Sequence, residues 1–137
     1  MKYVLDASVA FKWLVSEADS HKALLLRDDF RSGIHELLAP DVLPIEVGHA
    51  LTRAERQGRV SVADGFILWS GMMADCPRLF PSVALMPHAY AHSSQFRIGI
   101  YDCLYVALAE QEQCEIVSDD SRLAALFPKQ VVLLSSF

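Results

Sequence analysis

Asp6 and Asp120 occupy similar places in the sequence, each just after a short apolar run and directly before a helical pattern. The apolar runs at residues 3–5 and 116–118 are typical of buried strands. At the carboxyl ends of parallel strands, two such acids would lie beside a functional crevice. Taken singly, each is better explained as the N-cap of the following helix, where Asp contributes about 1 kcal/mol.

Asp102 and Glu46 stand at the beginning of two other helical patterns. Asp102 has large apolar neighbours on both sides within residues 100–105, and a carboxylate in such a place is costly unless it has a partner. Glu46 follows Pro44 in the first turn of its helix, beside the apolar stripe rather than opposite it. The helix dipole favours an acid there, so Glu46 also has a purely structural explanation.

Together the four acids indicate a cation site more strongly than any one of them does alone. Carboxylates within ~4 Å of one another repel by several kcal/mol at an effective dielectric of roughly 20. Such a cluster either takes up protons or binds a cation. Oxygen-only ligands suit Mg²⁺ or Mn²⁺ rather than zinc. From spacing alone, the four acids could equally form a metal site or be unrelated helix caps.

The elements that must position these acids alternate between short apolar strands and amphipathic helices. We predict strands at residues 3–5, 37–39, 81–85, 115–118 and 131–134. We predict helices at residues 7–15, 20–30, 44–57, 61–73, 87–96, 101–109 and 121–127. This alternation predicts right-handed βαβ units. We therefore expect one α/β domain over residues 1–137, with a twisted parallel sheet of about four to five short strands and helices on both faces.

Composition places the chain among folded proteins of the cell interior. It has 137 residues, 53% hydrophobic and 21% charged, enough to bury a core without disulfide or metal staples. No apolar run approaches the ~20 residues that span a bilayer. The first acid comes too early for a signal peptide. The three scattered cysteines form neither a disulfide framework nor a zinc pattern. We expect a cytoplasmic protein without a membrane segment.

The net charge of −5 neither supports nor excludes a nucleic-acid partner. A phosphate-binding protein usually carries a basic surplus. Without the four acids of the candidate site, however, the rest of the chain is close to neutral.

Four segments resemble the motifs of a known family. Residues 4–9, 44–47, 101–109 and 117–123 are similar, in order and spacing, to the motifs of the PIN-domain family, and in particular to VapC-type toxins. Each motif is short, but four in register are specific. The resemblance extends over essentially the whole chain.

The resemblance assigns roles residue by residue. It makes Asp6, Glu46, Asp102 and Asp120 the four metal-binding and catalytic acids. Asp120 belongs to a Thr/Ser-x-Asp motif, which here reads Ser118-Asp119-Asp120. Because two acids are adjacent, either could face the metal, and the register favours Asp120. Ser8, Ser118, Asp119 and Arg122 are further candidates for contacts around the ligands or with substrate.

The resemblance also implies a function and partners. It implies cleavage of RNA phosphodiester bonds with one or two Mg²⁺ or Mn²⁺ ions, a homodimer, and a cognate antitoxin protein that holds the toxin inactive. His49, one turn after Glu46, is expected near the rim of the crevice. The alternative is a catalytically silent PIN domain that acts as a protein-binding module.

Overall fold

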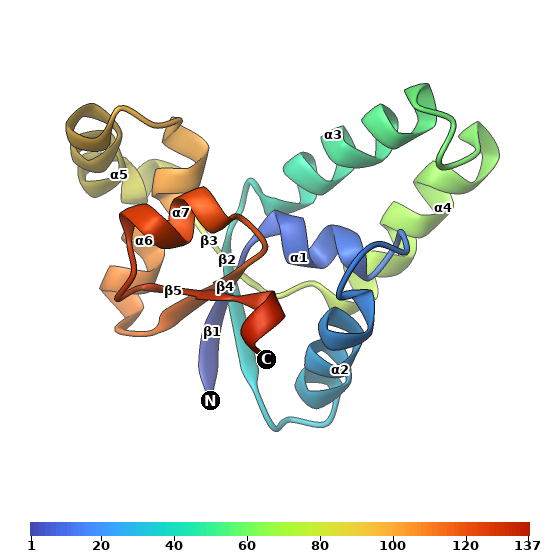
Figure 1. Cartoon of the computed structure of the whole chain (residues 1–137), viewed down its shortest axis with the longest axis horizontal. Coiled ribbons are helices and arrows are strands. Elements are labelled where there is room, and N and C mark those ends of the chain that lie inside the picture. The colour runs from blue at the N-terminus through green and yellow to red at the C-terminus, as the bar shows by residue number, and fades with distance from the viewer.

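A five-stranded, fully parallel sheet forms the centre of the structure, a computed structural model that describes residues 1–137 (Figure 1). The strand order is β3-β2-β1-β4-β5. The strands are β1 (Lys2–Leu5), β2 (Glu36–Pro40), β3 (Arg78–Phe80), β4 (Glu115–Ser118) and β5 (Val131–Leu133). The expected parallel sheet of about five short strands is confirmed.

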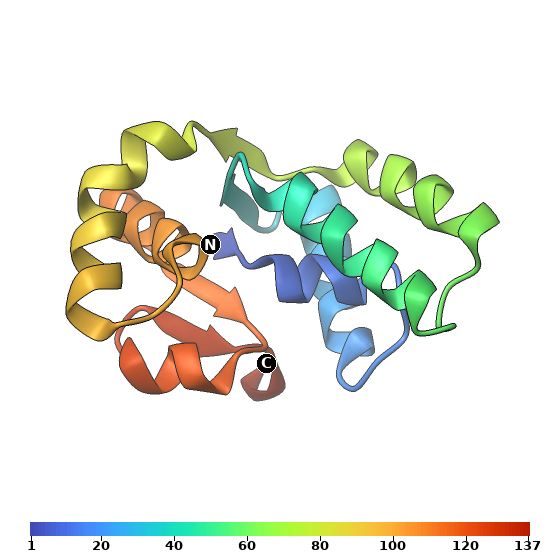
Figure 2. The same ribbon diagram turned by 90° about the horizontal axis from the view of Figure 1, so that it is seen from above.

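Helices cover both faces of the sheet. They are α1 (Ala7–Lys12), α2 (Ser20–Arg31), α3 (Leu43–Arg56), α4 (Val62–Met72), α5 (Ser82–Phe96), α6 (Ile100–Glu112) and α7 (Ser121–Leu126), with two 3-10 turns at Met73–Asp75 and Leu134–Ser136. Figure 2 shows α1 to α4 on one side of the sheet and α5 to α7 on the other. None of these helices combines the length and apolarity needed to cross a bilayer.

The middle strand β1 is buried between β2 and β4. Val4 aligns with Leu38 on β2 and with Ile116 on β4, and all three side chains are fully buried. Helix α6 lies against β1, β2 and β4, and every residue from Cys103 to Ala109 is buried. This burial fixes the position of α6, and with it the position of Asp102 in its first turn.

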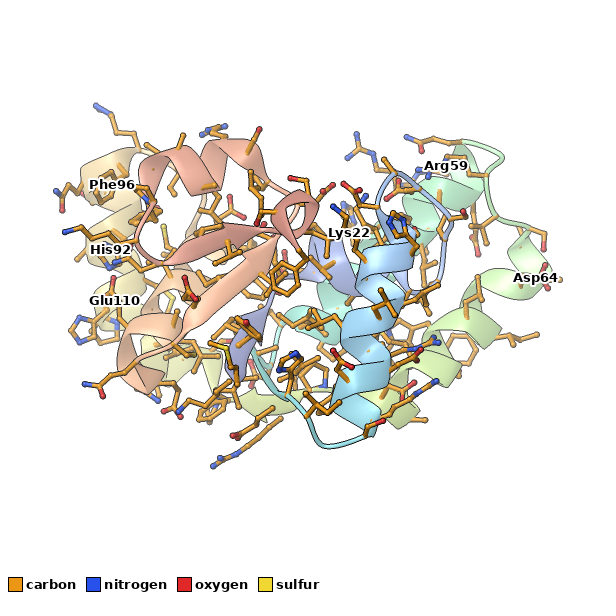
Figure 3. The ribbon with its side chains drawn as sticks, turned by 60° about the horizontal axis from the view of Figure 1, so that its bottom comes forward. Lys22, Arg59, Asp64, His92, Phe96 and Glu110 are labelled. Atoms are coloured by element: carbon orange, nitrogen blue, oxygen red, sulfur yellow. The ribbon has the colours of Figure 1, made fainter.

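Helix α5 is fastened to its neighbours by a histidine (Figure 3). His92 Nε2 lies 2.7 Å from Glu110 Oε1 on α6. The His92 ring also meets Phe127, just after α7, edge to face at a centroid distance of 5.5 Å. The three helices of this side therefore form one layer.

The predicted strand at residues 81–85 is wrong. The third strand is Arg78–Phe80, and residues 82–85 form the first turn of α5, which runs through Pro87. The carboxylate of Asp41, just after β2, accepts hydrogen bonds from the Ser82 amide (3.1 Å) and hydroxyl (2.5 Å). This cap begins the helix at Ser82. In the sequence, these apolar residues between two prolines match a strand pattern. The acid that caps the helix lies far away in the sequence, so no local signal indicates a helix start.

Helices α3 and α4 form a hairpin that extends away from the sheet (Figures 1 and 2). Trp69 on α4 donates its indole N–H to the Pro44 carbonyl at the start of α3 (2.8 Å). Apart from the start of α5, which lies five residues before the predicted start at residue 87, the predicted helix ends agree to within three residues.

Candidate active site

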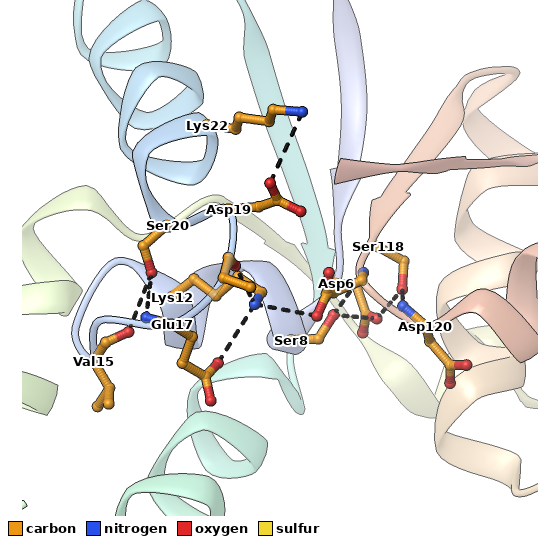
Figure 4. A network of polar contacts seen from close by, with 12 residues as sticks. Asp6, Ser8, Lys12, Val15, Glu17, Asp19, Ser20, Lys22, Ser118 and Asp120 are labelled. Carbon is orange, nitrogen blue, oxygen red and sulfur yellow. Dashed lines mark hydrogen bonds and ion pairs between the residues drawn. The ribbon is translucent and has the colours of Figure 1, made fainter. Parts of the chain in front are cut away.

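Asp6 lies at the carboxyl end of β1 and is held by two serines (Figure 4). Its Oδ2 accepts hydrogen bonds from Ser118 Oγ (2.5 Å) and Ser8 Oγ (2.9 Å). Burial raises the pKa of Asp6, the two serine hydrogen bonds lower it, and the nearby charge of Asp120 raises it further. Although Asp6 occupies the N-cap position of α1, its side chain makes no capping hydrogen bond. Helix capping therefore does not explain this acid.

Asp120, in contrast, does cap a helix. Its Oδ1 accepts the backbone N–H groups of Arg122 (3.0 Å) and Leu123 (3.1 Å) at the start of α7. Its own amide donates to Ser118 Oγ (3.0 Å). Ser118 therefore connects Asp120 to Asp6, one from each of two adjacent strands. The second carboxylate oxygen, Oδ2, makes no hydrogen bond with the protein.

The carboxylate of Asp119 is paired with a lysine on α1. Its carboxylate lies 3.2 Å from Lys12 Nζ, and its amide donates to Ser8 Oγ (3.1 Å). Lys12 is buried at the end of α1 and also donates to the Ala18 carbonyl (2.7 Å). The pairing with Lys12 draws the Asp119 carboxylate toward α1, whereas the charge of Asp120 acts on Asp6 and Asp102. This difference favours Asp120 as the fourth acid of the site.

Glu46 is oriented by a buried tyrosine. Tyr105 on α6 donates its hydroxyl to Glu46 Oε1 (2.7 Å). Burial raises the pKa of Glu46 to about 7, against the lowering effect of the tyrosine hydrogen bond, and the charges of Asp6 and Asp102 contribute to the rise. The sequence analysis includes Tyr105 in the predicted helix at residues 101–109 but assigns it no function. The signal for its role is that a buried tyrosine hydroxyl usually has a hydrogen-bond partner.

Asp102 completes the group from the first turn of α6. Burial raises its pKa, the charges of Asp6 and Asp120 raise it further, and Arg122 opposes them. Its carboxylate makes no hydrogen bond or ion pair with another side chain. Arg122 thus lies near enough to Asp102 to lower the pKa of that carboxyl.

The structure brings the four predicted acids together at one edge of the sheet. The charges of Asp6 and Asp102 raise the pKa of Glu46, and the charge of Asp120 raises the pKa values of Asp6 and Asp102. Their arrangement does not form a ready-made ligand set, because no three His, Cys, Asp or Glu side chains are placed to hold a metal ion. Glu46 is held by Tyr105. The donor chemistry nevertheless suits a hard divalent cation, since all four donors are carboxylates. A cation here would offset the burial and the like-charge repulsion that raise the pKa values of Asp6, Glu46 and Asp102.

A hollow of about 480 Å³ opens beside Glu46. It is lined by Val42, Ile45, Glu46, His49 and Tyr101. His49 therefore lies at the rim of the site, as its position one turn after Glu46 predicts.

Comparisons of the sequence with known proteins identify the family of the chain. Residues 3–126 match the family described as the PIN domain. The chain is 33% identical to Ribonuclease VapC1 of Mycobacterium tuberculosis over 129 residues, which covers 89% of this chain and 88% of that protein. It is 30% identical to Ribonuclease VapC3 of Pyrobaculum aerophilum, with 96% and 98% covered.

The fold also matches a solved structure. The crystal structure of PAE2754 from Pyrobaculum aerophilum superposes with a TM-score of 0.68 at 22% identity, over 99% of this chain and 94% of that one. That likeness concerns the fold, whereas the match over residues 3–126 and the two relatives concern the family. The chain is a member of the PIN-domain family, of the VapC type.

Proposed function

We propose that this chain is a divalent-metal-dependent endoribonuclease and the toxin of a toxin–antitoxin pair. The observation that carries the proposal is the convergence of four interacting carboxylates beyond the carboxyl ends of β1 and β4. The relatives named as VapC ribonucleases give the reaction class.

Asp6, Glu46, Asp102 and Asp120 would hold one or two Mg²⁺ or Mn²⁺ ions. A divalent cation bound there supplies positive charge to the scissile phosphate and acidifies an attacking water. The chain's own contribution is to position the carboxylates. Ser8 and Ser118 fix the orientation of Asp6.

The test is cleavage of total cellular RNA by purified protein free of antitoxin. Discrete fragments are expected with Mg²⁺ or Mn²⁺ and not with EDTA. Asp6→Asn serves as the control for contaminating nucleases, because it changes one carboxylate to a near-isosteric amide. Equal cleavage by wild type and Asp6→Asn would reject the assignment of the site.

Calorimetric titration with Mn²⁺ distinguishes the nuclease from the alternative, a catalytically silent module that binds protein. A nuclease with this site gives saturable binding that Asp102→Asn weakens. A silent module shows no saturable binding and no metal-dependent fragments.

For the antitoxin we propose the apolar groove between α3 and α4. The groove has a volume of about 330 Å³, and its walls include Ile45, Gly48, Leu51, Phe66 and Trp69. Phe66 stacks on Trp69 at a centroid distance of 5.7 Å but is 73% exposed. An amphipathic segment of a partner would bury these side chains by the helix-in-groove mode.

Phe66→Asp should free the toxin from its antitoxin without reducing RNA cleavage by the isolated protein. Growth of cells that co-express the two proteins measures this directly.

We also propose that the protein is a homodimer, and sedimentation equilibrium of the isolated chain tests this. If Phe66→Asp dissociates that dimer, the groove is the contact between two copies instead of the antitoxin site.

A further inference from the structure

The lysine and arginine side chains of this acidic protein fall into two groups, those in ion pairs and those without one. The chain has twelve Lys and Arg residues. Seven of them form ion pairs with carboxylates, namely Lys2, Lys12, Lys22, Arg27, Arg31, Arg59 and Arg78. The other five are exposed and make no ion pair, namely Arg53, Arg56, Arg97, Arg122 and Lys129.

Four of the five unpaired cations lie on or just before a helix whose first residues include an acid of the site. Arg122 lies in α7, which Asp120 caps, and Arg97 ends α5 three residues before α6, the helix that carries Asp102. Arg53 and Arg56 lie on α3, the helix that carries Glu46. Lys129 lies elsewhere, because it precedes β5 and so stands at the amino edge of the sheet.

A path along α3 leads from Glu46 to Arg53 past two hollows that share His49. His49 lines the hollow beside Glu46 and also a second hollow of about 260 Å³ between α1 and α3. The second hollow is lined by Phe11, His49, Ala50, Arg53, Gln57 and Arg59. Glu46 and Arg53 are seven residues apart, two helical turns or about 10 Å along the same face of α3. The path thus runs from a carboxylate of the site to an unpaired guanidinium.

Arg53 is the free cation of this second hollow. Arg59, which also lines the hollow and is labelled in Figure 3, is already bound to Glu17, with Nη2 2.7 Å from Oε2. Arg53 has no carboxylate partner, and its neighbours in the hollow, His49 and Gln57, can donate hydrogen bonds to an anion. This set of donors suits phosphate groups on an extended backbone.

We propose that the hollow at His49, Arg53 and Gln57 binds the RNA backbone on one side of the scissile phosphate. The inference rests on the proposed ribonuclease function and specifies how its substrate is held. Four carboxylates repel a polyanion, so affinity for RNA must come from cations outside the ligand set. Arg53 supplies such a charge at a fixed distance from Glu46. Because it meets phosphate and not a base edge, it contributes affinity without selecting sequence.

The experiment measures RNA binding apart from cleavage. Fluorescence anisotropy of a fluorescein-labelled single-stranded RNA is followed with the Asp6→Asn protein in EDTA, so that no strand is cut. Arg53→Gln is made in the same background. Lys129→Gln is the matched control, since it removes one exposed and unpaired charge at the opposite edge of the sheet. Arg53→Lys keeps the charge.

Arg53→Gln should weaken RNA binding about threefold to fivefold at low salt. The slope of log affinity against log salt concentration should become shallower by ~0.7, the value for one lost phosphate contact on a single strand. Lys129→Gln should leave both quantities unchanged, and Arg53→Lys should restore the slope. In the cleaving enzyme, Arg53→Gln should raise KM more than it lowers kcat.

Equal effects of Arg53→Gln and Lys129→Gln would overturn the proposal while leaving the ribonuclease function intact. If the Asp6→Asn protein binds no RNA at any salt concentration, the RNA path is also rejected. The proposed function is then decided independently, by the fragments that wild-type protein does or does not release from cellular RNA.

Discussion

The hydroxyl of Ser118 donates to the carboxylate of Asp6 at 2.5 Å and accepts the amide of Asp120 at 3.0 Å. A single side chain thereby connects the acid after β1 to the acid after β4, whose strands are already paired through their backbones. Ser118 is fully buried, so its two hydrogen bonds are not exchanged with water. The spacing of two of the proposed metal ligands depends on this serine.

Ser118→Ala should therefore reduce both activity and stability. Metal affinity and RNA cleavage should fall about 10- to 100-fold, the usual cost of losing a group that orients a ligand. The free energy of unfolding should fall by about 1 to 3 kcal/mol, because buried Asp6 loses a donor. Calorimetry with Mn²⁺ and urea unfolding measure the two effects. Ser94→Ala, at an exposed serine, is the control, and the same loss in both variants would contradict the explanation.

Tyr105→Phe tests the hydrogen bond that orients Glu46. The tyrosine hydroxyl lowers the pKa of Glu46, so its removal should raise that pKa further above about 7. At neutral pH the variant should bind Mn²⁺ roughly tenfold more weakly. The deficit should shrink at higher pH, where Glu46 is ionised without help. Tyr90→Phe, at a tyrosine that is 66% exposed, should bind Mn²⁺ like wild type. A pH-independent deficit would show that Tyr105 acts in another way.

The adjacent acids Asp119 and Asp120 should differ sharply in importance. Asp120→Asn should lower RNA cleavage by more than about 100-fold, because it alters a proposed ligand and not only a supporting group. Asp119→Asn should keep most activity and lose about 1 kcal/mol of stability from the weakened pair with Lys12. Initial cleavage rates and thermal unfolding of the two purified variants make the comparison. The reverse order of activities would move the fourth ligand to Asp119.

The metal-free protein should lose stability as the pH rises. The pKa values of Asp6, Glu46 and Asp102 are all raised in the folded state, so folding favours their protonated forms. Their contribution is fully present below the ordinary carboxyl pKa of about 4 and is lost as the pH rises through about 7, where Glu46 ionises. Thermal unfolding in EDTA should show a falling Tm over this range. Glu46→Gln should flatten the dependence, and Mn²⁺ should restore the Tm at the higher pH. A Tm in EDTA that rises with pH would exclude this linkage.

The sheet could be predicted from the sequence because its buried strands are encoded locally. The apolar runs that became β1, β2 and β4 are each bounded by polar residues, proline or an acid, and their positions are correct to within one residue. The third strand could not be found in this way. It pairs at the sheet edge through three residues that are not buried, so it carries little apolar signal.

The four acids of the site could be recognised, but their supporting partners could not. Helical periodicity places Tyr105 and Lys12 on elements without indicating what they contact. Tyr105 meets Glu46 across 59 positions, and Ser118 meets Asp6 across 112. Such pairings depend on strand order, which the sequence did not determine. Asp119 and Asp120, identical in type and adjacent, differ in their partners because Asp120 caps α7 whereas Asp119 pairs with Lys12 on α1.

The pairing of β1 with β4 also has a consequence for synthesis of the chain. Strand β1 and its neighbour β4 are far apart in the sequence, because Tyr3 aligns with Glu115 and Val4 with Ile116. Contacts of such long range form late, after the intervening chain is available. A nascent chain that has just produced β1 and Asp6 therefore still lacks Asp102 and Asp120. The order of the strands in the sheet delays assembly of the site until β4 and the residues after it have been synthesised.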